Sequence, residues 1–344
     1  MNLLGATASE LAAQVDCTPA EARRVLACLV SQGSTHLSGM KRPVSKRIQA
    51  RIQQHSWSRP RVLARVEDAD DHSLRYLFEL DDGARVEAVR IPLEREGRFS
   101  VCLSSQVGCA MRCDFCATGR LGLTRNLTAA EMVGTWLTVR DEAPGRVTGS
   151  VFMGQGEPFH NYEQVLRAAS VLSHPCGGRI SAKSITISTV GLVPQIHRFA
   201  DERQPFRLVI SLTSALPQRR ALLLPMASRW SLEELAEALR RVQRVQGRRM
   251  TLAWVLIGGL TDQPEEVAEI ARVFGDMPLR INLIDVNEAR DEGYARSSTE
   301  QRDRFIDALQ ALEAPVVRRY SVGATQSSAC GMLASAFQEE STCV

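Results

Sequence analysis

The sequence predicts an α/β fold, a partial parallel barrel of six strand–helix units preceded by a small helical domain and a short antiparallel β lead-in. Two observations indicate the barrel. From Ser100 onward, short aliphatic and β-branched runs alternate with longer helical stretches, which is typical of parallel strands joined by helices. Polar and glycine-containing motifs follow these strands, and functional residues of barrels collect at the carboxyl ends of strands.

Composition limits the class of protein. With 344 residues, 44% of them hydrophobic, the chain can form one large domain with a sizeable core and one small domain. No apolar run reaches the roughly 18 residues that cross a bilayer, and no N-terminal basic segment precedes an apolar signal core. We therefore expect a cytoplasmic monomer with no membrane partner. A net charge of +3 does not by itself indicate nucleic-acid binding.

Residues 1–58 are expected to form the small helical domain. Thr18 can cap a helix that begins at Pro19, and apolar residues follow at helical spacing. The stretch between Met40 and Val66 then contains no acidic residue. Its cations include Lys41, Arg42, Lys46, Arg47, Arg51, Arg59 and Arg61. Such a block can neutralise RNA phosphates, but a solvated linker would look the same, and both interpretations stay open.

The rest of the chain divides into a lead-in, a barrel and a tail. Residues 59–99 predict antiparallel strands, with Asp81-Asp82-Gly83 as a hairpin turn. Residues 100–335 predict the barrel, and 336–344 a tail. The expected barrel strands are 149–153, 184–188, 207–212, 250–256, 279–284 and 316–320, and the expected helices are 128–140, 161–173, 231–245, 264–274 and 299–312.

A C-x3-C-x2-C motif, formed by Cys109, Cys113 and Cys116, is the most informative feature of the chain. Three thiols leave one position of a metal assembly open for a substrate or cofactor. Structural zinc usually has four ligands, and no His or second Cys pair follows at suitable spacing, so zinc is the weaker interpretation. Nine scattered cysteines without a secretory signal also argue against a disulfide framework. The motif therefore favours an iron–sulfur cluster.

Further motifs follow in order along about residues 75 to 335. They are 104–109, 116–119, 122–129, 151–158 with Asn161, 187–189, 211–212, 282–284 and 329–331. Together with the cysteine spacing, which is that of radical S-adenosylmethionine (SAM) enzymes, they resemble the RlmN and Cfr family of dual-specificity adenine methyltransferases. The resemblance implies a 4Fe–4S cluster held by the three cysteines, with SAM at its fourth iron.

The resemblance also implies which residues bind SAM. These positions are Gly156, Glu157, Ser188, Ser211, Leu212, Thr213 and Asn287. Glu157 would accept a hydrogen bond from the SAM amino group, and the neighbouring glycines would let the backbone approach SAM. Without the resemblance, Gly154-Gln155-Gly156 would only indicate a tight turn, and a single Ser or Asn a loop cap.

The chemistry of the family needs a second set of cysteines, because an adenine ring carbon is not nucleophilic enough to attack SAM. One SAM methylates an enzyme cysteine, and a second SAM yields the radical that activates this methyl group, so two SAM are used per turnover. By resemblance, Cys330 is the methyl carrier, Cys102 resolves the protein–RNA crosslink by forming a disulfide, and Glu87 accepts the proton. Considered alone, Cys102 would be a core residue and Glu87 a solvent-facing strand residue.

The resemblance implies methylation of adenosine at C2, or alternatively C8, in 23S rRNA and by extension in tRNA, with an electron donor such as flavodoxin. Several positions depart from the family pattern, and the N-terminal helix lacks its usual aromatic residues. The departures are Gln155, Thr213, Glu288, residues 325–327 and Met332. They leave open a diverged enzyme that uses the same chemistry on a non-ribosomal substrate. A non-catalytic, zinc-stabilised RNA-binding protein is the alternative from another class.

Overall fold

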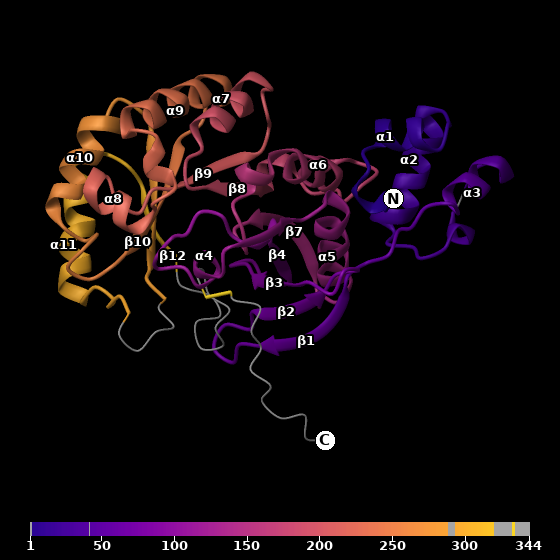
Figure 1. The fold of residues 1–344 in the computed structure, drawn as a ribbon, viewed down its shortest axis with the longest axis horizontal. Coiled ribbons are helices and arrows are strands. Elements are labelled where there is room, and N and C mark those ends of the chain that lie inside the picture. Colours follow the sequence, from indigo (N-terminus) through magenta and orange to yellow (C-terminus); the bar gives the residue numbers. More distant parts are fainter. Residues whose placement is uncertain (1, 41, 288–292, 320–331, 334–344) are drawn as a thin grey trace.

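The computed structural model describes residues 2–40, 42–287, 293–319 and 332–333. Its strands are β1 (Arg61–Glu67), β2 (Leu74–Glu79), β3 (Arg85–Pro92), β4 (Arg98–Leu103), β5 (Gln106–Gly108), β6 (Leu123–Asn126), β7 (Arg146–Phe152), β8 (Ile185–Thr189), β9 (Arg207–Ser211), β10 (Met250–Leu256), β11 (Leu279–Asp285) and β12 (Val316–Arg319). All except β5 and β6, which pair with each other, belong to one ten-stranded sheet in chain order (Figure 1).

The parallel part of this sheet is the predicted partial barrel, and the prediction is confirmed. Neighbouring strands are parallel from β4 through β7 to β12. The six expected strands correspond to β7–β12, and β4 is a further parallel strand that precedes them. β4 is parallel to β7 but antiparallel to β3, so it joins the barrel to the antiparallel lead-in.

The helices between the parallel strands lie on the outside of the sheet (Figure 1). They are α5 (Ala129–Asp141), α6 (Tyr162–Ser173), α7 (Val193–Asp201), α8 (Pro217–Leu223), α9 (Leu232–Gln246), α10 (Pro264–Phe274) and α11 (Thr299–Gln310). The five predicted helices are α5, α6, α9, α10 and α11, each within two residues of its expected bounds. The sequence did not predict α7, α8 or the short helix α4 (Ala117–Leu121).

Local sequence explains where the well-predicted helices begin and end. Thr128 accepts a hydrogen bond from the Glu131 amide, and the Glu131 carboxylate accepts one from the Thr128 amide, a capping box that starts α5. Ser231 and Glu234 form the same box before α9. Gly247 ends α9 with a φ of 62°, a left-handed conformation that glycine adopts without a steric penalty.

The N-terminal helical segment packs on α5 through its first turn, Leu3–Gly5. Its helices are α1 (Ala8–Gln14), α2 (Pro19–Leu26), which starts at the predicted Thr18 cap, and α3 (Lys46–Ile52), with single turns at Leu3–Gly5 and Ala27–Ser31. Leu3 and Leu4 are buried in the same apolar core as the barrel. A Cβ atom at Gly5 would lie 2.3 Å from the Ala130 nitrogen, so only glycine allows this close approach. The domain boundary at residue 58 stays a prediction.

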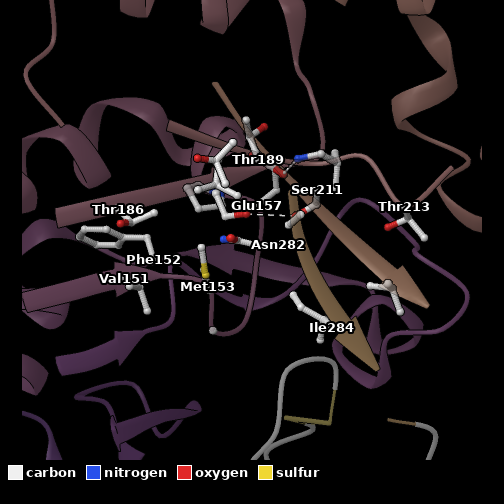
Figure 2. A pocket seen from close by; sticks show the side chains of 18 of the residues that line it. Val151, Phe152, Met153, Glu157, Thr186, Thr189, Ser211, Thr213, Asn282 and Ile284 are labelled. Atoms are coloured by element: carbon white, nitrogen blue, oxygen red, sulfur yellow. Dashed lines mark hydrogen bonds between the residues drawn. The ribbon is translucent and has the colours of Figure 1, made fainter. Parts of the chain in front are cut away.

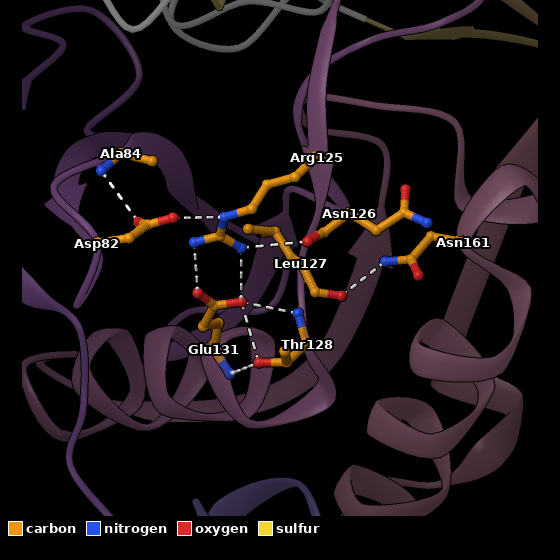
Figure 3. A network of polar contacts seen from close by, with 8 residues as sticks. All are labelled: Asp82, Ala84, Arg125, Asn126, Leu127, Thr128, Glu131 and Asn161. Carbon is orange, nitrogen blue, oxygen red and sulfur yellow. Dashed lines mark hydrogen bonds and ion pairs between the residues drawn. The ribbon is translucent and has the colours of Figure 1, made fainter. Parts of the chain in front are cut away.

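A polar network around Arg125 fixes the strands that flank the cysteine motif (Figure 3). Arg125 on β6 donates to Asp82 in the β2–β3 turn (2.6 Å) and to Glu131 on α5 (2.8 and 3.2 Å). Asn161 donates to the carbonyl oxygens of Ser105 (2.8 Å) and Leu127 (2.7 Å). The β2–β3 turn, α5 and Asn161 therefore hold the β5–β6 pair in place. The cysteine motif lies between β5 and β6 in the sequence.

The main core lies between the sheet and the outer helices. Trp136 on α5 and Trp254 on β10 are fully buried, and Trp254 packs at 5.9 Å, ring to ring, on Phe305 of α11. The indole of Trp254 donates to the Thr261 carbonyl (2.9 Å), which satisfies its buried N–H. In the described part of the chain, no helix combines the length and apolar character needed to cross a membrane.

Candidate active site

A cavity of about 630 Å³ lies inside the barrel (Figure 2). Most of the predicted site residues line it. They are Cys102, Cys109, Cys113, Cys116, Gly156, Glu157, Ser188, Ser211, Thr213 and Asn287. They come from the carboxyl ends of parallel strands and from the loops that follow, as expected for a barrel. The structure therefore brings together residues that are up to 185 positions apart in the sequence, from Cys102 to Asn287.

The three cysteines of the motif share one wall of this cavity. Cys109 and Cys113 are 7% and 8% exposed, and Cys116 is half-buried. Backbone hydrogen bonds hold their loop, from Cys109 N to the Gly122 carbonyl (2.8 Å) and from Cys116 N to the Cys113 carbonyl (3.2 Å). Burial raises the pKa of Cys109 to about 12 and also raises that of Cys113. Because metals bind thiolates, loading these sulfurs with iron must release protons.

The donor set fits a 4Fe–4S cluster. Among the described residues, no group of three or more His, Cys, Asp or Glu side chains is arranged to hold a single metal ion. A cluster has a different requirement, because each thiolate binds a separate iron atom and the sulfurs need not meet at one point. Cys109, Cys113 and Cys116 meet this requirement, since all three face the same cavity.

Glu157 is a buried carboxylate at the edge of the cavity, 2% exposed. Its Oε1 accepts from the Phe159 amide (2.8 Å) and its Oε2 from the Val190 amide (2.9 Å). Burial raises the pKa of Glu157 to about 7, although these hydrogen bonds act in the opposite direction. A carboxylate has about four acceptor positions, so Glu157 can also accept a bond from a ligand amine.

Gly156, one of the predicted SAM-binding positions, has to be a glycine for a structural reason that does not involve SAM. Gly156 has a φ of 98°, which L side chains rarely adopt. A Cβ atom there would lie 2.5 Å from the Cβ of Gln106. Packing against Gln106 therefore already requires glycine at this position. The amide of Glu157 donates to the Gln106 side chain (2.9 Å), so the same contact fixes the carboxylate.

Ser188, Ser211 and Thr213 contribute hydroxyl groups to the cavity from the carboxyl-terminal ends of β8 and β9. Ser211 and Thr213 are labelled in Figure 2. The hydroxyls of Ser188 and Ser211 are 3.0 Å apart. Thr213 has a φ of 59°, which is strained for a β-branched residue, and strain of this kind collects at functional sites. Its buried hydroxyl has no hydrogen-bond partner within the described residues, so it can bond a ligand.

Asn282 is a cavity residue that the predicted site did not include. It lies on β11, is 7% exposed, and appears beside Glu157, Met153 and Ser211 in Figure 2. Its Oδ1 has no hydrogen-bond partner among the described residues, which is costly for a buried amide unless a ligand supplies one. The family motif at 282–284 was the signal that could have identified it. Asn287, which was predicted, accepts from Arg296 (2.9 Å).

Cys102 lies at the same cavity, next to the end of the described chain. Its side chain is 6% exposed and packs with Val89 and Leu333. The hydroxyl of Thr118, which follows the cysteine motif, donates to the Leu333 carbonyl. Leu333 thus connects Cys102 with the cluster loop. Cys330, the predicted methyl carrier, lies outside the described residues, as do Glu288 and 325–327.

Glu87 is fully buried, so the expectation of a solvent-facing strand residue, drawn from the pattern alone, is wrong. Its strand β3 is interior, because β2 and β4 pair with its two edges. Arg75 Nη1 lies 4.0 Å from Glu87 Oε1. The Glu87 amide donates to the side chain of Gln155 (3.3 Å), one of the positions that depart from the family. Within the described chain, neither Glu87 nor Leu212 lines the cavity. The side chain of Leu212 lies in the main core instead.

Much of the basic block is neutralised by acids elsewhere in the protein. Arg47 and Arg51 pair with Asp16 at 3.3 and 2.5 Å. Arg59 pairs with Asp141 on α5 (2.8 Å), and Arg61 with Glu79 on β2 (2.5 Å). Lys41 lies outside the described residues.

Two cations of the block remain available. Arg42 and Lys46 are exposed, and no ion pair within the described chain involves them. The surface charge that could contact RNA is therefore smaller than the sequence indicates.

Comparison with known proteins agrees with this geometry. The family model of the radical SAM superfamily matches residues 103–272. A probable RNA methyltransferase of Anaeromyxobacter sp. is 43% identical over 97% of this chain and 99% of its own length. The dual-specificity RNA methyltransferase RlmN of Geobacter sulfurreducens is 36% identical over 91% of this chain and 85% of its own length.

A solved structure extends this similarity to the fold. The crystal structure of a radical SAM methyltransferase from Sphaerobacter thermophilus matches with a TM-score of 0.88 and 34% identity, and covers 98% of this chain and 100% of that one. Radical SAM enzymes use a 4Fe–4S cluster and SAM, which agrees with the cysteine wall and the polar cavity described above. The chain therefore belongs to the RlmN-type radical SAM RNA methyltransferases.

Proposed function

We propose that this enzyme methylates a ring carbon of adenosine in RNA, at C2 rather than C8, with 23S rRNA as its main substrate and tRNA as a second one. The cavity is the observation that supports this proposal most. It contains the three cluster cysteines, the polar SAM positions and Cys102 in one space. Two SAM molecules per turnover and a reduced electron donor such as flavodoxin belong to the proposal.

Cys330 carries the methyl group in this proposal, and Cys102 releases the product. Leu333 packs against Cys102. Cys330 precedes Leu333 by three positions in the sequence. Release requires loss of the ring proton and formation of a disulfide between the two cysteines. The contact of Leu333 with Cys102, and the hydrogen bond from Thr118 to the Leu333 carbonyl, support these roles.

Glu87 is proposed as the acceptor of the ring proton. A base must be ionised, and a fully buried carboxylate tends to remain protonated. The guanidinium of Arg75, 4.0 Å from Glu87, favours the ionised form because opposite charges attract strongly in a buried environment. Arg75 therefore supports a base at this position.

The exposed Arg42 and Lys46 are proposed to contact RNA phosphates. A stacked adenine cannot enter the cavity, so the target must be an accessible or extruded base. The double variant Arg42→Glu, Lys46→Glu should bind RNA more weakly and retain SAM cleavage. Arg244→Glu, Arg304→Glu, on α9 and α11, changes the net charge equally and is the control. Unchanged RNA affinity in the first variant, or an equal loss in the control, would remove this role.

The reaction is tested by mass spectrometry of nucleosides from 23S rRNA and tRNA of a host without its own RlmN. We expect 2-methyladenosine with the wild type and none with Cys330→Ala. The variant Cys102→Ala should accumulate a protein–RNA crosslink, whereas Cys28→Ala, which changes a buried cysteine of the N-terminal helices, should behave like the wild type. A peak of 8-methyladenosine would correct the position.

A non-ribosomal substrate is the second candidate. The internal ion pairs of the basic block favour it, as does Gln155, a departure from the family, in contact with Glu87. The same experiment separates the two candidates. If a cluster-loaded enzyme cleaves SAM but leaves rRNA and tRNA without a new methylated adenosine, the ribosomal proposal fails and this candidate replaces it.

A further inference from the structure

Arg220 is a buried cation next to the cysteine loop. It lies on α8 and is 3% exposed. Its Nη1 donates to the Leu212 carbonyl (3.1 Å) and its Nη2 to the Val190 carbonyl (2.9 Å). These carbonyls directly follow β9 and β8, the strands that end in Ser211 and Thr189. Arg220 therefore holds the ends of two cavity strands together.

No carboxylate compensates the charge of Arg220 in the part of the chain that the structure describes. The guanidinium has no ion pair there, and its buried Nε has no hydrogen-bond partner. Neighbouring Arg219, in contrast, pairs with Glu266 (3.3 Å). Arginine is almost never fully buried without a partner, because removing a charge from water costs several kcal/mol. The position therefore calls for an anion.

The cysteine motif is the place from which this anion can come. The amide of Asp114, the residue after Cys113, donates to the carbonyl of Leu223 at the end of α8 (3.1 Å). Leu224, whose amide donates to the Arg220 carbonyl (2.7 Å), lines the cavity together with Cys113. Burial lowers the pKa of Arg220 to about 10, and the charge of the Cys113 thiolate acts in the opposite direction. One turn of helix thus connects Arg220 with the cluster loop.

We propose that Arg220 is the fixed counter-cation of the iron–sulfur cluster, a positioning residue that favours cluster binding and reduction. Three thiolates give the loaded site a net negative charge, and reduction adds another electron. A buried cation stabilises each more negative state relative to the less negative one. Arg220 therefore helps the thiolates to form and makes the reduced cluster more accessible to the electron donor. This inference does not depend on which RNA is methylated.

A purely structural role for Arg220 makes a different prediction. A clamp that only binds the carbonyls of Leu212 and Val190 would change stability when lost, but it would not change the redox properties of a folded protein. The midpoint potential therefore distinguishes the two roles, because it depends on the charge near the cluster and not on fold stability.

Three variants, purified without oxygen and reconstituted with iron and sulfide, provide the test. Arg220→Gln removes the charge and keeps an amide donor, Arg220→Lys keeps the charge with fewer donors, and Arg219→Gln is the control on the same helix. We expect Arg220→Gln to contain less iron per chain and to have a more negative midpoint in a redox titration followed by electron paramagnetic resonance. Arg220→Lys should remain near the wild-type midpoint, and Arg219→Gln should match the wild type.

The opposite results would overturn the proposal. A folded Arg220→Gln with wild-type iron content and midpoint would reduce Arg220 to a structural clamp. If Arg220→Gln does not fold, the midpoint potential of Arg220→Lys tests the proposal. A wild-type midpoint potential in Arg220→Lys supports the proposal. A clear shift to a more negative potential contradicts it, because the positive charge is still present. An equal shift in Arg219→Gln would show a general effect of net charge and would likewise reject a specific role.

Discussion

At the scale of single residues, two effects on the ionisation of Glu157 oppose each other: burial and hydrogen bonding. Its carboxylate is fully buried, which disfavours the charge, yet two backbone amides already point at its oxygens. The pKa of about 7 is the result of this competition. Carboxylates with a perturbed pKa are found mostly at functional sites, where a ligand interacts with their charge. An amine placed beside Glu157 would stabilise the ionised form.

This competition makes the stability of the SAM-free protein depend on pH. The pKa of Glu157 is 4.5 without perturbation and about 7 in the folded protein, so the folded state binds this proton more tightly. The contribution of Glu157 to the free energy of unfolding should therefore fall by about 3 kcal/mol as the pH rises from about 4.5 to 7. Above pH 7 this contribution should stay constant. In Glu157→Gln this component should be absent. Urea titrations from pH 5 to 8 measure it, and parallel profiles for both proteins would contradict the prediction.

Thr213 should contribute one hydrogen bond to SAM. Thr213→Val keeps the shape and β-branching but removes the hydroxyl that has no partner in the described residues. A neutral hydrogen bond contributes about 0.5–1.5 kcal/mol, so the dissociation constant for SAM should rise about two- to tenfold in equilibrium dialysis with cluster-loaded enzyme. Thr251→Val, which changes a cavity residue near the start of β10, is the control. Equal affinities for Thr213→Val and wild type would exclude this contact.

At the scale of elements, Arg125 connects the cluster loop with the rest of the fold (Figure 3). Its hydrogen bond lowers the pKa of Asp82 to about 2. Because the folded pKa is below the normal value of 3.8, the contribution of this pair is present above pH 4 and is lost as the pH falls toward 2. Asp82 is half-exposed, so solvent screens the pair, and the bond to the more buried Glu131 contributes more.

Replacing Arg125 should therefore loosen the flanks of the cysteine motif. Arg125→Ala removes charge-assisted hydrogen bonds to two acids, and we expect a loss of roughly 2 kcal/mol in the free energy of unfolding at pH 7. Reconstituted protein should also lose iron faster to a chelator. Arg61→Ala, which breaks a single exposed pair with Glu79, is the control and should change both quantities little. Equal iron loss in the two variants would contradict the role of the network.

The elements that the sequence predicted are those with local signals. α5 and α9 have capping boxes, and their apolar residues recur at helical spacing. α7 and α8 have no side-chain cap and only nine and seven residues, and the proline in the first turn of each was a local start signal that the prediction did not use. β4 is parallel to one neighbour and antiparallel to the other, a property of pairing across the sheet that its six residues do not contain.

The same limit applies to the site. The cysteine motif and Glu157 lie within short patterns whose chemistry is visible in the sequence, and the structure places them together. The burial of Glu87 was not predictable from alternation along β3, because the strand is buried on both faces from Val86 to Arg90, and the segments that contact it, such as α5, are distant in the sequence. The ion pairs of the basic block were also hidden, since Asp141, the partner of Arg59, lies 82 positions away in the sequence.

At the scale of the whole molecule, the N-terminal helices and the barrel share one core. Leu3, Leu4 and Leu11 belong to the same cluster of buried residues as the barrel. The guanidinium of Arg140 on α5 donates to the Val30 carbonyl (2.7 Å), which adds a partly buried polar contact between the two parts. A segment that shares its core in this way should unfold together with the barrel, although its sequence reads as a separate small domain.

Gly5→Ala tests this coupling. A methyl group there would lie 2.3 Å from the backbone nitrogen of Ala130, so the N-terminal segment must move away from α5, at a cost of about 1–3 kcal/mol. Gly97→Ala is the contrast, because its φ is positive and no atom lies within 4 Å of the added methyl group, so it introduces backbone strain without a clash. If the parts unfold as one unit, hydrogen exchange should accelerate in both α2 and β10 of Gly5→Ala. If it accelerates in α2 alone, the helices are an independent domain, and their RNA contacts can change without affecting the barrel.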